Sequence, residues 1–248
     1  MGRILCIANQ KGGVGKTTTA VNLAVALARS GARTLLADLD PQCNATSGLG
    51  CKPVDRHPLV SQQPLRESLV SDVVPNLDLL PGSRCFEDLE FLASLDDGRS
   101  ATLVRHMETG LNLYDFALID CPPSLGQLTR TALAGSTEVL MPIQCEYFAM
   151  EGLTQMIEVI RDVMKRSSRR LAFAGILLTM YDHTLDITRE VDEEVRDFFG
   201  DIVFQTVIPR DAAVCEAPSH GRSVLDYAPR TRGARAYAEL CLEVLDRE

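Results

Sequence analysis

Short apolar runs alternate with longer segments of helical periodicity along almost the whole chain. The apolar runs have the length of β-strands and lie near residues 3–8, 34–38, 77–80, 115–120, 138–143, 172–179 and 203–208. Apolar residues recur with the period of an α-helix over 17–30, 87–109, 124–134, 150–165, 185–199 and 231–246. This alternation is typical of a mostly parallel, twisted sheet with helices on both faces, so we predict an α/β fold of about seven or eight strands.

Turn-forming residues refine this pattern at two places. Gly31 follows the first helical segment, where a helix commonly ends in a left-handed residue. The stretch 44–64 is rich in Gly, Pro, Ser and Gln, which predicts a mobile connection and not a linker between domains. Because 248 residues are enough for one large core, we expect a single domain, 1–248.

Composition excludes several classes of protein. Hydrophobic residues make up 46% and charged residues 24%, which is ordinary for a soluble globular protein. No apolar run approaches the ~18 residues that cross a membrane, and no export signal precedes the first strand. Eight cysteines are scattered without a Cys-x-x-Cys pair, so we expect reduced cytosolic thiols and not a zinc or iron–sulfur site.

The segment 9–18 carries the clearest chemistry. It reads Asn-Gln-Lys-Gly-Gly-Val-Gly-Lys-Thr-Thr and joins the first predicted strand to the first predicted helix. A glycine-rich turn at this place points its backbone amides and the helix dipole at one anion, which makes it a phosphate cradle. Lys16 can reach the β- and γ-phosphates, and the Thr17 hydroxyl can ligate Mg²⁺.

One position departs from the standard phosphate loop. Gln10 stands where that pattern has glycine, and a second lysine, Lys11, follows it. One lysine suffices to bind the phosphates within a subunit. Position alone therefore leaves two interpretations of Lys11: a solvated cation that steers anions, or a cation that reaches a phosphate held by a second copy.

The string Lys-Gly-Gly-Val-Gly-Lys-Thr resembles the deviant Walker A box of the ParA/MinD ATPases. The resemblance implies an ATP-sandwich dimer in which Lys11 acts in trans, as an arginine finger does. Asp38-Leu-Asp40-Pro-Gln looks like switch I, in which Asp40 orients the attacking water. The strand that ends at Asp120 looks like Walker B, and Cys121-Pro-Pro-Ser resembles switch II.

Two later segments, 208–211 and 216–221, look like the adenine-side loop and helix of the ParA/Soj branch. The boxes occur in family order, so the resemblance covers nearly the whole chain. It implies catalytic roles for Lys11, Lys16 and Asp40, and Mg²⁺ contacts from Thr17, Asp40 and, through water, Asp120. The implied ATP contacts are Lys11, Gly12, Gly13, Val14, Gly15, Lys16, Thr17, Thr18, Pro209 and Asp211. From the residues alone, Asp40 could instead cap a turn. In the family, many relatives have Asn where this chain has Asp211.

As a ParA/Soj-type ATPase, the protein would dimerise with ATP, bind DNA without sequence preference and release it when a ParB-like partner stimulates hydrolysis. This resemblance implies a cytoplasmic protein that joins the nucleoid when ATP-bound. Soj-like relatives often carry arginines where this chain has Thr184 and Ala213. The net charge of −9 also argues against a generally basic surface. Candidate DNA contacts in their place are Arg189, Arg222, Arg230 and the basic run 165–170.

Three alternatives remain beside this interpretation. One is a ParA-like positioner of a protein cargo that does not bind DNA. Another is a MinD-like membrane cycler, which needs a C-terminal amphipathic helix with a basic face. The last apolar-periodic segment instead has an acidic face, with Glu239, Glu243 and Asp246, which anionic lipid would repel, so we expect it to dock on the core. The third is an iron–sulfur electron donor. Cys121 would lie beside the nucleotide, but no second cysteine has the spacing that a cluster needs. The sequence does not identify the cargo or the adaptor.

Overall fold

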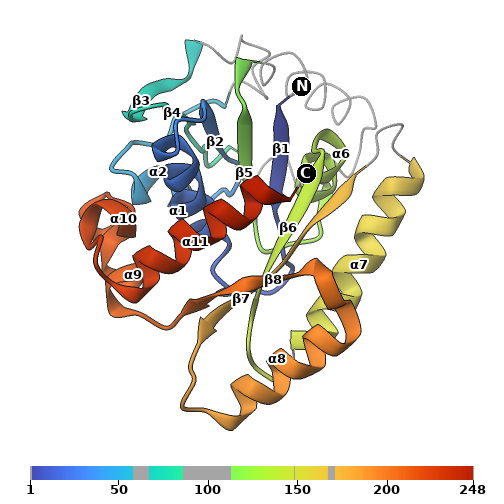
Figure 1. Ribbon diagram of the computed structural model, residues 1–248. Coiled ribbons are helices and arrows are strands. Elements are labelled where there is room, and N and C mark those ends of the chain that lie inside the picture. Colours follow the sequence, from blue (N-terminus) through green and yellow to red (C-terminus); the bar gives the residue numbers. More distant parts are fainter. Residues whose placement is uncertain (1, 58–66, 86–112, 148, 167–170, 248) are drawn as a thin grey trace.

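The structure, a computed structural model, describes residues 2–57, 67–85, 113–147, 149–166 and 171–247. Its centre is an eight-stranded sheet in the order β3-β4-β2-β5-β1-β6-β7-β8 (Figure 1). The strands are β1 (Arg3–Ile7), β2 (Thr34–Asp38), β3 (Val70–Val74), β4 (Leu77–Leu80), β5 (Phe116–Asp120), β6 (Glu138–Gln144), β7 (Ala172–Tyr181) and β8 (Val203–Pro209). All neighbouring pairs are parallel except β3 and β4, which confirms the predicted fold class.

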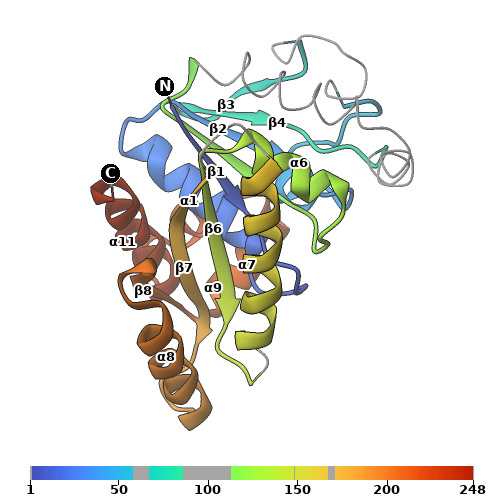
Figure 2. The same cartoon turned by 90° about the vertical axis from the view of Figure 1, so that its right-hand side faces the viewer.

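Helices cover both faces of the sheet, because successive residues of a strand point to opposite sides. On β1, Ile4 and Cys6 join one buried cluster with α6 (Gln127–Gly135), α7 (Ala149–Arg166) and α8 (Asp186–Phe199). Leu5 and Ile7 join the other cluster with α1 (Lys16–Arg29) and α11 (Arg232–Asp246). Figure 2 shows α1 and α11 on one side of the sheet and α6 and α7 on the other.

Short elements complete the chain between these helices and strands. They are α2 (Asn44–Gly48), η3 (Gly200–Ile202), α9 (Ala212–Glu216), η4 (Ala217–His220) and α10 (Val224–Tyr227). The last three lie beside the start of α11 (Figure 1). Gly31 follows α1 with φ of +97°, as its predicted capping place requires.

Two sequence predictions need correction, and a third lies outside the described residues. The stretch 44–64, predicted as a mobile connection, begins with α2, because Asp38 accepts hydrogen bonds from the Thr46 amide and hydroxyl and so fixes that turn; residues 58–64 of the stretch lie outside the described residues. The pattern also missed β3, whose residues are exposed or half-buried and lack a continuous apolar run. The helix predicted over 87–109 falls within 86–112, which the structure does not describe.

The C-terminal helix α11 docks on the core, as its acidic face predicts. Tyr237, Leu240 and Val244 are at most 1% exposed and pack in the cluster with α1. These apolar side chains are therefore not available to a lipid surface. Among the described residues, no helix combines the length and apolar character needed to cross a membrane.

Candidate functional site

The phosphate loop lies between the carboxyl end of β1 and the first turn of α1. Gly13 and Gly15 have φ of +75° and +87°, conformations that side chains with a Cβ rarely adopt. Gly15 is the N-cap of α1, so the unsatisfied amides of the helix face the loop. The predicted glycines therefore shape an anion cradle at a helix N-terminus.

Lys16 is buried inside this cradle, with 6% of the residue exposed. Its Nζ donates a hydrogen bond to the backbone carbonyl of Lys11 at 2.8 Å, across the open turn. Burial lowers the pKa of Lys16, and the carboxylates of Asp120 and Asp40 oppose that shift. The cation is thus aimed into the place where the loop would hold a phosphate.

Two aspartates end neighbouring strands at the same level. Asp38 on β2 and Asp120 on β5 are paired in register, and both are fully buried. Asp38 accepts hydrogen bonds from Thr46 Oγ1 at 2.6 Å, the Thr46 amide at 2.9 Å and the Asp40 amide at 3.2 Å. Burial outweighs these bonds and raises the pKa of Asp38 to about 6. Asp38 is therefore an anchor of the switch I turn.

Asp120 is the opposite case. Across the part of the chain that the structure describes, neither of its carboxylate oxygens finds a hydrogen-bond partner. Burial, and next the nearby Asp38 carboxylate, raises the pKa of Asp120 well above its usual range, while the Thr17 hydroxyl and Lys16 act in the other direction. A buried carboxylate without donors is costly, and a hard divalent cation is the ligand that compensates it. The residues fit a Mg²⁺ site.

Asp40 accepts fewer hydrogen bonds than Asp38 but, unlike Asp120, has a partner. It is 5% exposed, and its Oδ1 accepts the Gln42 amide at 2.9 Å. The turn-capping role suggested by the sequence is therefore real, but it uses one oxygen of the carboxylate. The predicted role in orienting water requires only the other oxygen.

Lys11 has a partner that the sequence did not reveal. Its Nζ lies 2.9 Å from Oε2 of Glu146, which follows β6, and both side chains are substantially exposed, at 39% and 50%. Asn9 supports the mouth of the loop, because its Oδ1 accepts the Lys11 amide at 3.0 Å and its Nδ2 donates to the Pro142 carbonyl at 2.8 Å. Glu146 lies 135 residues from Lys11 in the chain, so no local pattern marks the pair.

On the predicted adenine side, Asp211 has a structural task. Its Oδ1 accepts the Ala213 amide and its Oδ2 the Gly233 amide, both at 2.9 Å, so it caps α9 and fixes the start of α11. Pro209 ends β8 two residues before Asp211. Cys121 lies with its thiol 3.3 Å from that of Cys6 in the core.

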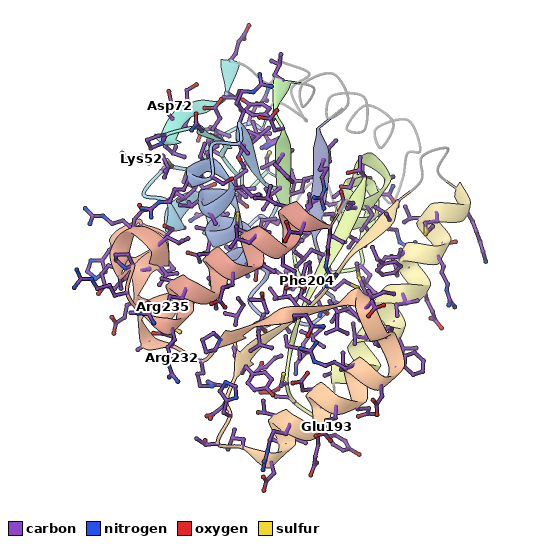
Figure 3. All side chains as sticks on the ribbon, in the orientation of Figure 1. Lys52, Asp72, Glu193, Phe204, Arg232 and Arg235 are labelled. Atoms are coloured by element: carbon purple, nitrogen blue, oxygen red, sulfur yellow. The ribbon has the colours of Figure 1, made fainter. Side chains whose placement is uncertain are left out.

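The candidate DNA contacts do not form one patch. Arg189 lies on the acidic helix α8 and pairs with Asp186. Arg222 and Arg230 are exposed near the start of α11, where Figure 3 also shows Arg232 and Arg235. Arg222 lines a cavity of about 290 Å³ together with Thr17 and Thr18. The backbone of the basic run is described only to 166, in α7.

A parallel sheet with a phosphate loop after its first strand and a buried acid at the end of the neighbouring strand defines a P-loop NTPase. A family model described as an AAA domain matches residues 2–173. The chain is 45% identical to the sporulation initiation inhibitor protein Soj of Bacillus subtilis over 98% of each chain. It is 43% identical to the chromosome partitioning protein ParA of Caulobacter vibrioides, over 99% of this chain and 95% of that one.

A solved structure extends the match to three dimensions. Cobyrinic acid a,c-diamide synthase from Mycobacterium smegmatis, with bound ADP and magnesium, superimposes with a TM-score of 0.84. It is 34% identical, and the alignment covers 99% of this chain and 94% of that chain. The chain belongs to the ParA/Soj family of chromosome-partitioning ATPases.

Proposed function

We propose that this protein binds Mg·ATP in the phosphate loop and hydrolyses it to ADP and phosphate. The observation that carries the proposal is Asp120, a fully buried carboxylate near Lys16 and Thr17 whose oxygens have no hydrogen-bond partner among the residues that the structure describes. The matched structure with ADP and magnesium supports the same ligands.

Each residue of the nucleotide site then has a distinct role. The amides of residues 12–18 and the Lys16 ammonium hold the β- and γ-phosphates. Thr17 and Asp120, the latter through water, would hold Mg²⁺, which supplies charge neutralisation when bound. Asp40 directs the attacking water, and Pro209 and Asp211 border the adenine. Positioning and charge neutralisation account for most of the acceleration expected of such a site.

Lys11 completes the site from a second copy, so the active form is an ATP-sandwich dimer. We further propose that this dimer binds DNA without sequence preference and is stimulated by a ParB-like partner. The similarity to the chromosome partitioning protein ParA of Caulobacter vibrioides supports this cycle. A dimer sums weak phosphate contacts from two subunits, which makes DNA affinity depend on nucleotide state. The expected place is the cytoplasm, with ATP-dependent association with the nucleoid.

A second candidate is a positioner of a protein cargo that does not bind DNA. Two structural observations favour it. Thr184 bonds its hydroxyl to Asp182 at 2.7 Å, and Ala213 is buried in α9, so neither place offers a cation. Arg189 lies on a helix dominated by acids.

Two measurements separate these functions. Phosphate release is measured with and without Mg²⁺ and duplex DNA. Absence of Mg²⁺-dependent release would remove the enzyme assignment. An electrophoretic mobility shift with ATP then tests DNA. We expect a shift that weakens steeply with salt, since phosphate contacts release counterions. No shift even at low salt would select the protein-cargo candidate.

A further inference from the structure

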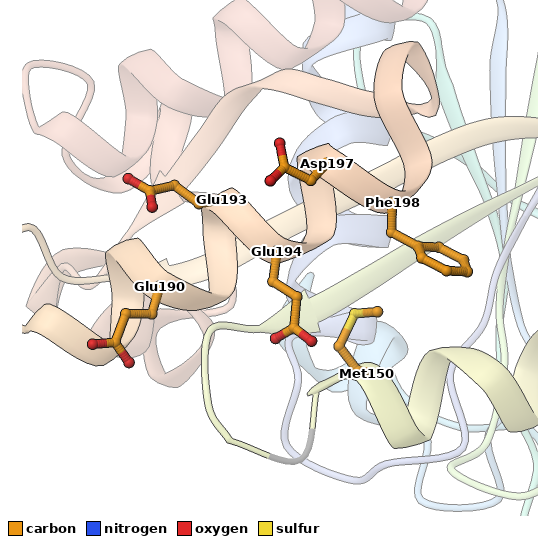
Figure 4. A pocket seen from close by; sticks show the side chains of 6 residues that line it. All are labelled: Met150, Glu190, Glu193, Glu194, Asp197 and Phe198. Carbon is orange, nitrogen blue, oxygen red and sulfur yellow. The ribbon is translucent and has the colours of Figure 1, made fainter.

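Two groups of polar side chains outside the phosphate loop differ in their access to water. One lines a surface groove of about 540 Å³ between α7 and α8, where Glu190 and Glu194 are exposed (Figure 4). The other lies in the interior beside Asp40, where Asp38 and Thr46 are both 0% exposed. Water satisfies the first group, whereas the buried group depends on hydrogen bonds within the protein. The buried bonds can therefore fix the position of a neighbouring side chain.

The Thr46 hydroxyl stands at the centre of this buried group. Its oxygen accepts a hydrogen bond from the Gly82 amide at 2.8 Å, and the hydroxyl donates to Oδ2 of Asp38 at 2.6 Å. An amide can only donate and a hydroxyl has a single proton, so the proton of Thr46 points at Asp38. The Thr46 amide donates to the same oxygen at 2.9 Å. The direction of each bond is thus determined.

The bonds continue from Asp38 into the turn that carries Asp40. Oδ1 of Asp38 accepts the Asp40 amide at 3.2 Å, while Oδ2 is held by Thr46. Both oxygens belong to one planar carboxylate, so a bond that orients Oδ2 also orients Oδ1. The Asp40 carbonyl then accepts the Cys43 amide at 2.8 Å, which closes the turn. The place of the Asp40 side chain therefore depends on the Thr46 hydroxyl.

Gly82 brings a second strand to the same point. It lies just after β4, which pairs with β2 in parallel. A Cβ at residue 82 would lie 2.9 Å from both Cγ and Oδ2 of Asp38, which is closer than a real Cβ approaches other atoms. Only glycine permits this close approach of the backbone. The Thr46 hydroxyl therefore joins α2, the end of β2 and the segment after β4.

We propose that Thr46 is a positioning residue for ATP hydrolysis, since its hydroxyl orients the Asp38 carboxylate, which in turn holds the Asp40 turn in place. Thr46 acts through Asp38 and needs no contact with the nucleotide. The inference rests on the proposed function, because it names what sets the geometry of the water-directing aspartate. Misplacement of a reacting group by about 1 Å can lower a rate about a hundredfold. Nucleotide affinity, which depends on the phosphate loop, should not change.

The test compares two substitutions of the same side chain. Thr46→Val keeps the branched shape but removes the hydroxyl, so Gly82 and Asp38 each lose a bond. Thr46→Ser keeps the hydroxyl and removes a methyl group. Thr34→Val is the matched control, because Thr34 is 0% exposed at the other end of β2 and its hydroxyl donates to the Ala32 carbonyl at 3.0 Å.

Phosphate release with saturating Mg·ATP measures kcat, and fluorescence anisotropy of a labelled non-hydrolysable ATP analogue with Mg²⁺ measures Kd. We expect Thr46→Val to lower kcat about ten- to hundredfold, as is usual when the support of a catalytic group is removed, with Kd unchanged. Thr46→Ser and Thr34→Val should keep the wild-type kcat. This division between kcat and Kd, with rescue by serine, distinguishes positioning from a general loss of structure.

Amide hydrogen exchange followed by mass spectrometry gives a readout that does not require hydrolysis. In the nucleotide-free, full-length protein, residues 38–46 should exchange faster in Thr46→Val than in the wild type, because the bonds that close the turn open more often. Thr46→Ser and Thr34→Val should exchange as the wild type does across these residues.

The outcomes separate this inference from the proposed function. A Thr46→Val protein with faster exchange but the wild-type kcat would overturn the inference, and so would an equal loss of kcat in Thr34→Val. If Thr46→Val does not fold, Gly82→Ala disturbs the same carboxylate from the side of β4, and an unchanged kcat there would contradict the proposal. If the wild type itself releases no phosphate, the proposed function fails, while exchange over 38–46 still shows whether Thr46 orders the turn.

Discussion

Replacing Asp120 by asparagine tests the chemistry of the site most directly. The change keeps the shape of the side chain but removes a charge that is fully buried and has no hydrogen-bond partner among the described residues. The effective penalty of an uncompensated buried ion is several kcal/mol, and Lys16 offsets part of it. We therefore expect Asp120→Asn to raise the free energy of unfolding of the nucleotide-free protein by about 2 kcal/mol near neutral pH.

The same variant should lose its response to nucleotide. A ligand at one hundred times its Kd stabilises a protein by about 2.7 kcal/mol, which for a chain of this size raises Tm by about 5–10 °C. We expect this shift in the wild type with Mg²⁺ and a non-hydrolysable ATP analogue. In Asp120→Asn the shift should fall to less than about half, because the cation loses its carboxylate.

Asp38→Asn is the matched control, because Asp38 is the register partner of Asp120 but is saturated with donors. An asparagine there replaces one of the two accepting oxygens by an NH2 group. A buried donor that faces this group loses its acceptor, which costs about 1–3 kcal/mol. Asp120 has no such donor to lose among the described residues. Its gain in stability should therefore be at least about 1 kcal/mol smaller than that of Asp120→Asn. Urea unfolding and thermal shift provide both measurements. A less stable Asp120→Asn protein that keeps its full nucleotide response would refute the assignment.

Three further predictions concern separate parts of the site and the core. Asp40→Ala should abolish turnover while ATP binding persists, and size exclusion should show a trapped ATP dimer; unchanged turnover would remove Asp40 from catalysis. Glu146→Gln should change the free energy of unfolding by less than about 1 kcal/mol, because the pair with Lys11 is largely exposed, and a larger loss in urea unfolding would contradict a surface pair. Burial lowers the pKa of His57 to about 3, so its contribution to stability is complete above its unfolded pKa of 6.5 and is lost as pH falls. At about pH 5 this loss should be about 2 kcal/mol relative to His57→Gln, and parallel stability curves for the two proteins would exclude it.

The pattern of the sequence predicted the sheet because its central strands are buried on both faces and therefore apolar throughout. β2 and β5 are continuous apolar segments that end in aspartate, and both appear where predicted. β3 was missed because it lies at the edge of the sheet, where only half-burial is required and polar residues are tolerated. The hydrophobic pattern therefore identifies the strands that are buried on both faces of the sheet.

In the candidate site, too, the sequence predicted some features and not others. The phosphate loop is local in sequence, so its glycines and Lys16 could be identified from ten consecutive residues. Contacts between distant segments could not be identified in this way. Glu146 meets Lys11 only because β6 lies next to β1, and Asp211 reaches Gly233 only because α9 packs against α11.

The pair between Lys11 and Glu146 bears on how the two copies would act on each other. Within one chain, Lys11 is held by a single exposed carboxylate, and such a pair contributes at most about 1 kcal/mol. Lys16, by contrast, is buried and bonded inside its own loop. Moving Lys11 from Glu146 to a phosphate of a second copy therefore costs little, while the phosphate, with its larger charge, offers a stronger partner. In the proposed dimer, Lys11 is thus the cation of the loop that is exposed enough to reach a second copy, whereas Lys16 remains buried and serves the phosphates of its own loop.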